Sequence, residues 1–289
     1  MVPEAKGGLV DGAFKIAATA EVTVQRLRAN ISVLLGGGGN IAVLTGPDGK
    51  VLVDAEIITA RPNVSKALAS INADPVQQLI NTHWHFDHTG GNEWLHEAGA
   101  TILAHENTRK HLSKETRVEG NWQYTFPPAP ASALPSIVFK DDYTLNVNGT
   151  TLMLKWYSPA HTDSDISVYF TEADILLTGD TFWNRDYPFI DYGTSGSIDG
   201  QIRAAEANIA TATDKTIVIP GHGAVGGKAD LILFRDVLVD IRDKVAALKK
   251  QGHSLSEVIA NNPGARYDAE WGQLFQGPAD FVALVYQGV

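Results

Sequence analysis

Three histidines and an aspartate are concentrated in the stretch Asn81-Thr82-His83-Trp84-His85-Phe86-Asp87-His88-Thr89-Gly90-Gly91. A buried strand is predicted just before it, at residues 76–80. Side chains alternate between the two sides of an extended backbone, so His83 and His85 face the same side and can bind one metal ion. Asp87 and His88 lie at the turn that follows, where they can reach a second ion. The two aromatic residues between these ligands then face the other way, into packing.

Three further polar residues follow predicted strands elsewhere in the chain. His161 comes after a strand at 151–156, Asp180 closes a strand at 175–178, and His222 follows a strand at 216–219. Each lies where an apolar strand meets a loop that contains glycine or proline, which is where a rigid scaffold presents functional side chains. Because the 83–88 cluster is present, we expect these three residues to complete its set of metal ligands.

The composition narrows the possible partners. The chain has 289 residues, of which 44% are apolar and 19% charged, which is enough to build a substantial core. A net charge of −10 without a Lys/Arg block disfavours nucleic acids and anionic membranes, so a small molecule is the expected partner. Cysteine is absent, which excludes disulfides, thiolate nucleophiles, Fe–S clusters and cysteine-based zinc sites.

The sequence predicts a soluble protein but no particular compartment. No apolar run reaches the roughly 18 residues that a spanning helix needs. Residues 1–20 lack the basic start and apolar block of a secretory leader. Both a cytoplasmic location and, if a leader has been removed, a periplasmic or secreted one are compatible with this pattern, and nothing in it predicts an oligomeric state.

The order of predicted elements indicates a layered α/β (α+β) fold. Both halves run from antiparallel strands to helix and strand, which predicts two sheets packed face to face with helices outside. Glycines 36–39 are interpreted as a hairpin turn between two strands, because no phosphate-binding lysine or helix follows them. We expect a single domain over 1–289, with a core at about 22–250 and a helical C-terminal extension at 251–289. The predicted strands are 22–28, 31–35, 40–45, 51–54, 76–80, 101–103, 137–139, 143–147, 151–156, 166–170, 175–178 and 216–219, and the predicted helices are 61–72, 92–98, 105–114, 198–210, 229–250 and 254–261.

Taken together, Thr82-His83-x-His85-x-Asp87-His88-x-Gly90-Gly91 and the later His161, Asp180 and His222 resemble the metallo-β-lactamase superfamily. The resemblance covers roughly residues 22–250 and implies a four-layer αββα sandwich of two mixed β-sheets. An aspartate at position 180 and the absence of cysteine resemble the glyoxalase II and lactonase-like branches rather than the β-lactamases proper.

The resemblance also implies a role for each ligand. His83, His85 and His161 would hold the first metal, Asp87, His88 and His222 the second, and Asp180 would bridge the two. Asp54, which ends an early strand, would orient the cluster from outside. Zinc is the metal expected for this nitrogen and oxygen set, with iron or manganese as alternatives.

The implied reaction is hydrolysis by a hydroxide that bridges two divalent ions. It would cleave an ester, thioester, lactone or lactam of a small molecule, with Asp87 or Asp180 moving the proton. Two alternatives stay open: a metallo-β-lactamase that hydrolyses β-lactam antibiotics, possibly as a promiscuous activity, and a non-catalytic metal-binding module.

Two aromatic segments are candidates for the substrate pocket. The region 116–136 is expected to be an irregular excursion that carries aromatic residues and forms part of a pocket wall. In the segment 183–192, Trp183, Tyr187, Phe189 and Tyr192 either contact substrate or pin the loop to the core, and both interpretations are kept. The remaining histidines are expected to face solvent or packing rather than metal: His96, His105, His111 and His253.

Overall fold

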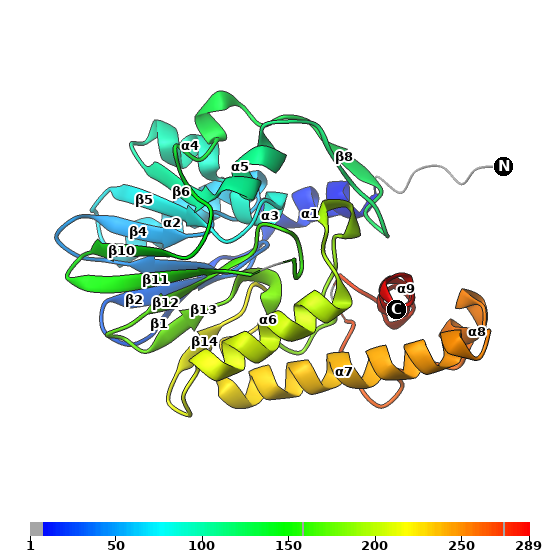
Figure 1. Cartoon of the computed structure of the whole chain (residues 1–289). Coiled ribbons are helices and arrows are strands. Elements are labelled where there is room, and N and C mark those ends of the chain that lie inside the picture. Colours follow the sequence, from blue (N-terminus) through cyan, green and yellow to red (C-terminus); the bar gives the residue numbers. More distant parts are fainter. Residues whose placement is uncertain (1–7, 158, 274) are drawn as a thin grey trace.

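The computed structural model describes residues 8–157, 159–273 and 275–289. Within these residues, two β-sheets pack face to face with helices on both outer sides (Figure 1). This is the predicted four-layer αββα sandwich of two mixed sheets. None of the described helices is both long and apolar enough to cross a membrane.

The first sheet has seven described strands in the order β1-β2-β3-β4-β5-β6-β9. Its first four strands form the antiparallel meander that the short apolar runs predict, whereas β4, β5, β6 and β9 are parallel neighbours. The strand bounds are β1 (Thr23–Arg26), β2 (Ile31–Leu35), β3 (Ile41–Leu44), β4 (Lys50–Val53), β5 (Val76–Asn81), β6 (Thr101–His105) and β9 (Ile137–Phe139).

The second sheet has five described strands in the order β10-β11-β12-β13-β14. Neighbours are antiparallel except for β13 and β14, which are parallel. The bounds are β10 (Tyr143–Val147), β11 (Thr150–Trp156), β12 (Ile166–Phe170), β13 (Ile175–Leu177) and β14 (Ile217–Ile219).

The strands of the first sheet are covered on both faces. Val33 on β2 contributes to the core between the sheets, while its neighbour Leu34 packs on the helix side. The inner core joins residues of both sheets, such as Val53 and Phe170. Because both faces are buried, these strands are continuous apolar runs rather than alternating ones.

Helices cover both outer faces of the sandwich (Figure 1). On the first sheet lie α2 (Arg61–Ile71) and α4 (Asn92–Glu97), with α5 (Glu106–Leu112) following β6. On the second lie α6 (Ile198–Thr211) and α7 (Lys228–Lys250). The C-terminal residues hold α8 (Leu255–Ala260) and α9 (Pro278–Gly288), and Phe281 of α9 shares a buried cluster with Phe234 of α7.

Two elements differ from the sequence prediction. A helix, α1 (Gly8–Thr19), forms in a segment where none was predicted. Its two glycines weaken its intrinsic helix propensity, but Ala13 and Ala17 are buried against the first sheet, and this packing supports the helix. The segment 116–136, predicted as irregular, contains a short hairpin of β7 (Thr116–Val118) and β8 (Tyr124–Phe126) followed by the turn η2 (Ala131–Ala133).

The loops that carry the candidate ligands meet at one edge of the sandwich. Strands β4, β5 and β6 are parallel, so their carboxyl ends point to the same edge. Glycines 36–39 form the predicted hairpin connection between β2 and β3, and this loop reaches the same edge, where the Gly39 N–H donates to the Asp87 carbonyl at 3.2 Å. The Asn40 N–H donates to the Gly221 carbonyl at 2.8 Å, so the edge gathers segments from both halves of the chain.

Candidate metal centre

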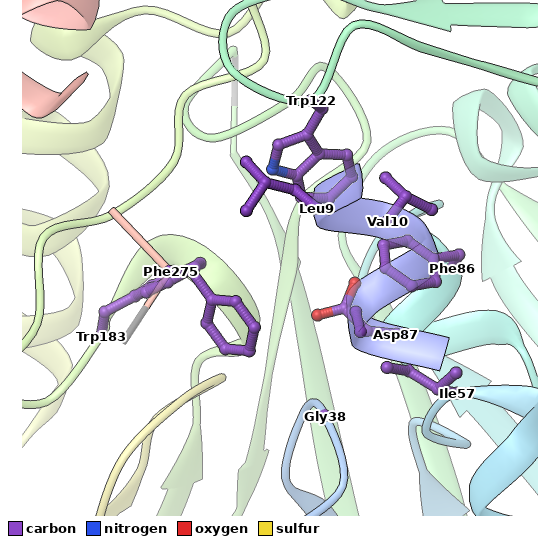
Figure 2. A pocket seen from close by; sticks show the side chains of 10 residues that line it. Leu9, Val10, Gly38, Ile57, Phe86, Asp87, Trp122, Trp183 and Phe275 are labelled. Carbon is purple, nitrogen blue, oxygen red and sulfur yellow. The ribbon is translucent and has the colours of Figure 1, made fainter. Parts of the chain in front are cut away.

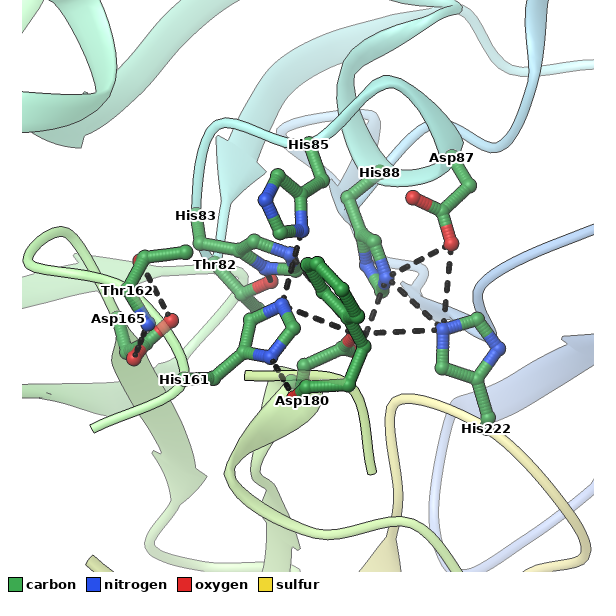
Figure 3. A network of polar contacts seen from close by, with 12 residues as sticks. Thr82, His83, His85, Asp87, His88, His161, Thr162, Asp165, Asp180 and His222 are labelled. Atoms are coloured by element: carbon green, nitrogen blue, oxygen red, sulfur yellow. Dashed lines mark hydrogen bonds and ion pairs between the residues drawn. The ribbon is translucent and has the colours of Figure 1, made fainter. Parts of the chain in front are cut away.

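The seven candidate ligands come from five segments at this edge and point toward one another (Figure 3). His83 and His85 follow β5, and Asp87 and His88 lie in the one-turn helix α3 (Phe86–Thr89). The other three residues lie beyond β11, in the turn η3 (Gly179–Thr181) after β13, and beyond β14: His161, Asp180 and His222. All seven are buried. The structure thus brings together residues spread over both halves of the chain.

The first group contains His83, His85, His161 and Asp180. The His161 Nε2 atom lies 2.8 Å from His85 Nδ1. Asp180 Oδ2 lies 3.4 Å from His161 Nε2 and 3.9 Å from His83 Nε2. Three ring nitrogens and one carboxylate oxygen therefore converge on one point.

The second group contains Asp87, His88 and His222. Asp87 Oδ2 lies 3.2 Å from His222 Nε2 and 3.6 Å from His88 Nε2, and the two Nε2 atoms are 3.4 Å apart. Asp180 also reaches this group, because its Oδ1 lies 3.1 Å from His88 Nε2 and its Oδ2 lies 3.3 Å from His222 Nε2. One carboxylate thus stands between the two groups.

The donor geometry fits metal ions better than it fits hydrogen bonding. The buried atoms His83 Nε2 and Asp87 Oδ1 have no hydrogen-bond partner in the described structure. A buried polar atom without a partner is costly and calls for an explanation. Ligands that bind one zinc ion at about 2.0–2.2 Å in a tetrahedron lie roughly 3.3–3.6 Å apart. The distances within both groups scatter around that value, so each group could hold a divalent cation.

Four of the imidazoles are oriented by a partner on the ring nitrogen that faces away from the cluster. Asp54 Oδ2 lies 2.8 Å from His88 Nδ1, and the Phe189 carbonyl accepts from His161 Nδ1 at 2.7 Å. The Thr82 hydroxyl lies 3.1 Å from His83 Nδ1, and Asp191 Oδ2 lies 3.1 Å from His85 Nε2. Such outer partners hold the tautomer and orientation of a metal-binding histidine.

Asp191 was not identified in the sequence. It lies 106 residues from His85 and no motif marks it, whereas Asp54 was expected from the family resemblance. The Asp191 carboxylate also accepts from the Thr194 hydroxyl at 2.6 Å. An acidic residue in the aromatic segment that follows Asp180 was the available signal, but many loops contain one.

Charge is distributed unevenly between the two groups. Burial lowers the pKa of His83 well below its ordinary value and that of His161 to about 4, so both rings are neutral at pH 7. Burial also opposes charge on His88 and His222, but the carboxylates of Asp180 and Asp87 outweigh it. The pKa of His222 is therefore raised to about 9, and that of His88 lies well above its ordinary value.

Comparison with known proteins agrees with this geometry. A family model described as "Metallo-beta-lactamase superfamily" matches residues 34–222, which is more than half of the chain. The chain belongs to the metallo-beta-lactamase superfamily. The resemblance proposed from the sequence is thereby confirmed.

Several curated relatives of this superfamily member are named as hydrolases or thioesterases. A hydroxyacylglutathione hydrolase from Polaromonas sp. (strain JS666) is 26% identical over 172 residues, which cover 59% of this chain and 57% of the relative. An atrochrysone carboxyl ACP thioesterase from Aspergillus fumigatus is 26% identical over 189 residues, which cover 65% of this chain and 51% of the relative. The chain thus spans little more than half the length of these two relatives.

Solved structures of the superfamily share the fold. A metallo-beta-lactamase from Pontibacter korlensis superposes with a TM-score of 0.60 at 17% identity, over 76% of this chain and all of that one. The inverting sec-alkylsulfatase Pisa1 from Pseudomonas sp. gives a TM-score of 0.67 at 16% identity, over 95% of this chain and 51% of that one. At such low identity these likenesses support the fold alone.

The four candidate substrate contacts, Trp183, Tyr187, Phe189 and Tyr192, have different surroundings. Trp183 lines a cavity next to Asp87, and Phe189 stacks on Trp122 with ring centroids 4.7 Å apart. Tyr187 donates its hydroxyl to Asp268 at 2.7 Å, and Tyr192 donates to the Leu284 carbonyl at 2.9 Å. The structure therefore favours the packing interpretation for the two tyrosines, which tie the 183–192 loop to the C-terminal segment.

Replacing Asp191 by asparagine is expected to weaken metal binding and hydrolysis about 10- to 100-fold, because His85 loses its ionic partner. Thr194→Val removes only the hydroxyl that donates to Asp191 and keeps the carboxylate itself, so we expect a smaller effect. Zinc affinity measured by competition with a chromophoric chelator checks both variants. Equal zinc affinities for wild type and Asp191→Asn would show that this contact does not support His85.

Proposed function

We propose that the seven residues hold two divalent cations, with Asp180 as the bridging ligand, and that the protein hydrolyses a small-molecule ester, thioester, lactone or lactam. The placement of the Asp180 carboxylate between two groups of buried imidazoles carries this proposal. Zinc suits the five imidazoles and two carboxylates, and iron or manganese would suit them too. The curated relatives, which include a hydroxyacylglutathione hydrolase and an ACP thioesterase by name, support the choice of reaction.

Bound divalent cations would supply a water of lowered pKa as nucleophile and a Lewis acid for the substrate carbonyl. Asp87 is suited to move the proton, because it borders the cavity and its Oδ1 has no hydrogen-bond partner. Burial raises the pKa of Asp87, but His88 and His222 outweigh this effect, so the pKa falls below its ordinary value and the group is a carboxylate at neutral pH. As the carbon–oxygen bond to water forms and the bond to the leaving oxygen, sulfur or nitrogen breaks, Asp87 passes the water proton to that leaving atom.

A metal analysis coupled to a hydrolysis screen tests the proposal. We expect about two metal ions per chain and turnover of at least one class in a panel of esters, thioesters, lactones and β-lactams. Dialysis against a chelator should abolish turnover, and added Zn²⁺ should restore it. Tightly bound metal without hydrolysis across the panel would instead identify a binding module, and turnover of β-lactams alone would identify a β-lactamase.

Metal binding is expected to release more protons from the second group than from the first. His88 and His222 carry protons at pH 7 in the metal-free protein because their pKa values are raised, and both must lose them to bind an ion. His83 and His161 are already neutral because their pKa values are lowered. Lowering the pH therefore weakens the second ion first, by about tenfold per pH unit for each imidazole that must lose a proton.

Calorimetric titration of the metal-free protein with Zn²⁺ in buffers of different ionisation enthalpy counts these protons. We expect about two protons to be released with one of the two ions at pH 7, falling as the pH approaches 9. Equal proton release for both ions would contradict the assignment of protonated imidazoles to the second group.

A further inference from the structure

A small apolar cavity opens beside Asp87 (Figure 2). Its volume is about 30 Å³, which is room for about two water molecules. Asp87 is the one charged residue among the described residues that line it, and no lysine or arginine is among them. Its lining residues are Leu9, Val10, Ala13, Gly38, Ile57, Phe86, Asp87, Trp122, Trp183 and Phe275.

One side of this cavity is fixed by packing. Trp183 is only 2% exposed, and Trp122 stacks on the buried Phe189 with an interplanar angle of 13°. Phe86 packs against Phe14 and Phe126, with ring centroids 5.2 and 5.4 Å away. Trp122 cannot move without disturbing Phe189, whose carbonyl accepts from His161.

The opposite side is formed by two side chains that can move. Leu9, in the first turn of α1, is 43% exposed, and Phe275 is 41% exposed. Phe275 contacts Trp183 and His222 edge-on, with ring centroids 6.2 and 5.8 Å away. Because both side chains are already partly in water, rotating them outward exposes a smaller fraction of their surface than moving the buried Trp183 would. The cavity can therefore enlarge on this side.

We propose that this cavity binds an uncharged alkyl or aryl group of the substrate and that Leu9 and Phe275 set the size of the group accepted. The substrate class rests on the proposed hydrolysis, because the group must lie next to the bond cleaved beside Asp87. A charged group among these apolar walls would lose its water and find no lysine or arginine on the described walls to replace it. Glutathione conjugates, which carry two carboxylates, are therefore disfavoured here, although relatives are named for them.

A binding measurement tests the cavity without requiring turnover. Calorimetry of the metal-loaded protein with the linear alcohols from ethanol to hexan-1-ol should show affinity rising about threefold to fourfold per methylene. Leu9→Ala and Phe275→Ala should extend this rise to octan-1-ol. Ile16→Ala is the matched control, because Ile16 lies on the same helix, is 67% exposed and does not line the cavity. The proposal would be overturned if affinity did not depend on the length of the alcohol. It would also be overturned if Leu9→Ala, Phe275→Ala and Ile16→Ala all changed the affinity equally.

Kinetics provide a second, independent readout. The ratio of kcat/KM for p-nitrophenyl hexanoate to that for p-nitrophenyl acetate should rise about fivefold or more in Leu9→Ala and Phe275→Ala, and should stay unchanged in Ile16→Ala. Leu9→Lys should lower the hexanoate rate and favour a negatively charged acyl group. If no ester, thioester, lactone or lactam is turned over, the proposed hydrolysis fails, while the alcohol series still decides whether the cavity binds apolar groups.

Discussion

Asp180→Asn is expected to reduce bound metal from about two ions per chain to one or fewer, and to lower kcat/KM by at least about a hundredfold. The Asp180 carboxylate oxygens lie 3.1, 3.3, 3.4 and 3.9 Å from the Nε2 atoms of His88, His222, His161 and His83. The substitution keeps the shape of the side chain but removes the negative charge that stands between two cations and five imidazoles. Loss of that charge should weaken metal binding by both ligand groups at once.

Elemental analysis of the purified variant and its hydrolysis rate measure this effect together. Asp163→Asn is the matched control, because Asp163 Oδ1 lies 2.8 Å from His111 Nε2 in a pair that belongs to neither ligand group. The control should keep full metal content and activity. Full metal loading and unchanged turnover in Asp180→Asn would remove Asp180 from the bridging role.

Asp54→Ala is expected to lower the free energy of unfolding by about 3–5 kcal/mol, the usual result of breaking a buried, charge-assisted network. Asp54 is fully buried and accepts from the Thr82 N–H, the Thr82 hydroxyl and His88 Nδ1 at 2.7, 2.7 and 2.8 Å. Alanine would leave these three donors unpaired. Asp54 also has a φ of +69°, a conformation that aspartate and asparagine tolerate better than alanine.

Asp54→Asn separates folding from metal binding. Asparagine tolerates the backbone conformation and can still accept from Thr82, so the loss of stability should be smaller than for alanine. If the amide oxygen keeps the bond from the Thr82 N–H, an NH2 group takes the place of Oδ2 and cannot accept from His88 Nδ1. The zinc affinity of the second group should therefore fall about 10- to 100-fold. Denaturant unfolding and zinc competition measure the two effects.

A control substitution shows whether any buried carboxyl would give the same result. Asp186 is also buried, but its Oδ1 accepts from the N–H groups of Tyr187 and Gly272 at 3.0 and 2.9 Å. Asp186→Asn should therefore affect stability without lowering zinc affinity comparably. Equal losses of zinc affinity in both variants would show that Asp54 has no special role toward His88.

Loop glycines show how closely the site is packed. A Cβ atom on Gly221 would lie 2.0 Å from Asp180 Oδ1, and one on Gly39 would lie 2.4 Å from a carbon of the His88 ring. The sequence marks both glycines only as parts of turns. Glycine is needed at both positions because the backbone there passes too close to a candidate ligand from another part of the chain to leave room for a Cβ atom.

The architecture and the candidate ligands could be predicted from the sequence because their signals are local. Buried strands produce apolar runs, and the spacing of His83, His85, Asp87 and His88 follows the alternation of an extended chain and the turn after it. The short helix α1 could not be predicted in this way, because its own propensity is weak and its packing against the sheet supports it.

Amino-acid order by itself determined the layered fold and placed seven polar side chains at the ends of strands, since each of those signals spans only a few neighbouring residues. Tertiary structure alone decided that these side chains converge, that Asp191 supports His85, and that Leu9 and Phe275 close an apolar cavity beside Asp87. The physical reason is that such contacts join segments up to about 266 positions apart (275 − 9 = 266), and only the packing of the two sheets and their outer helices brings those segments together.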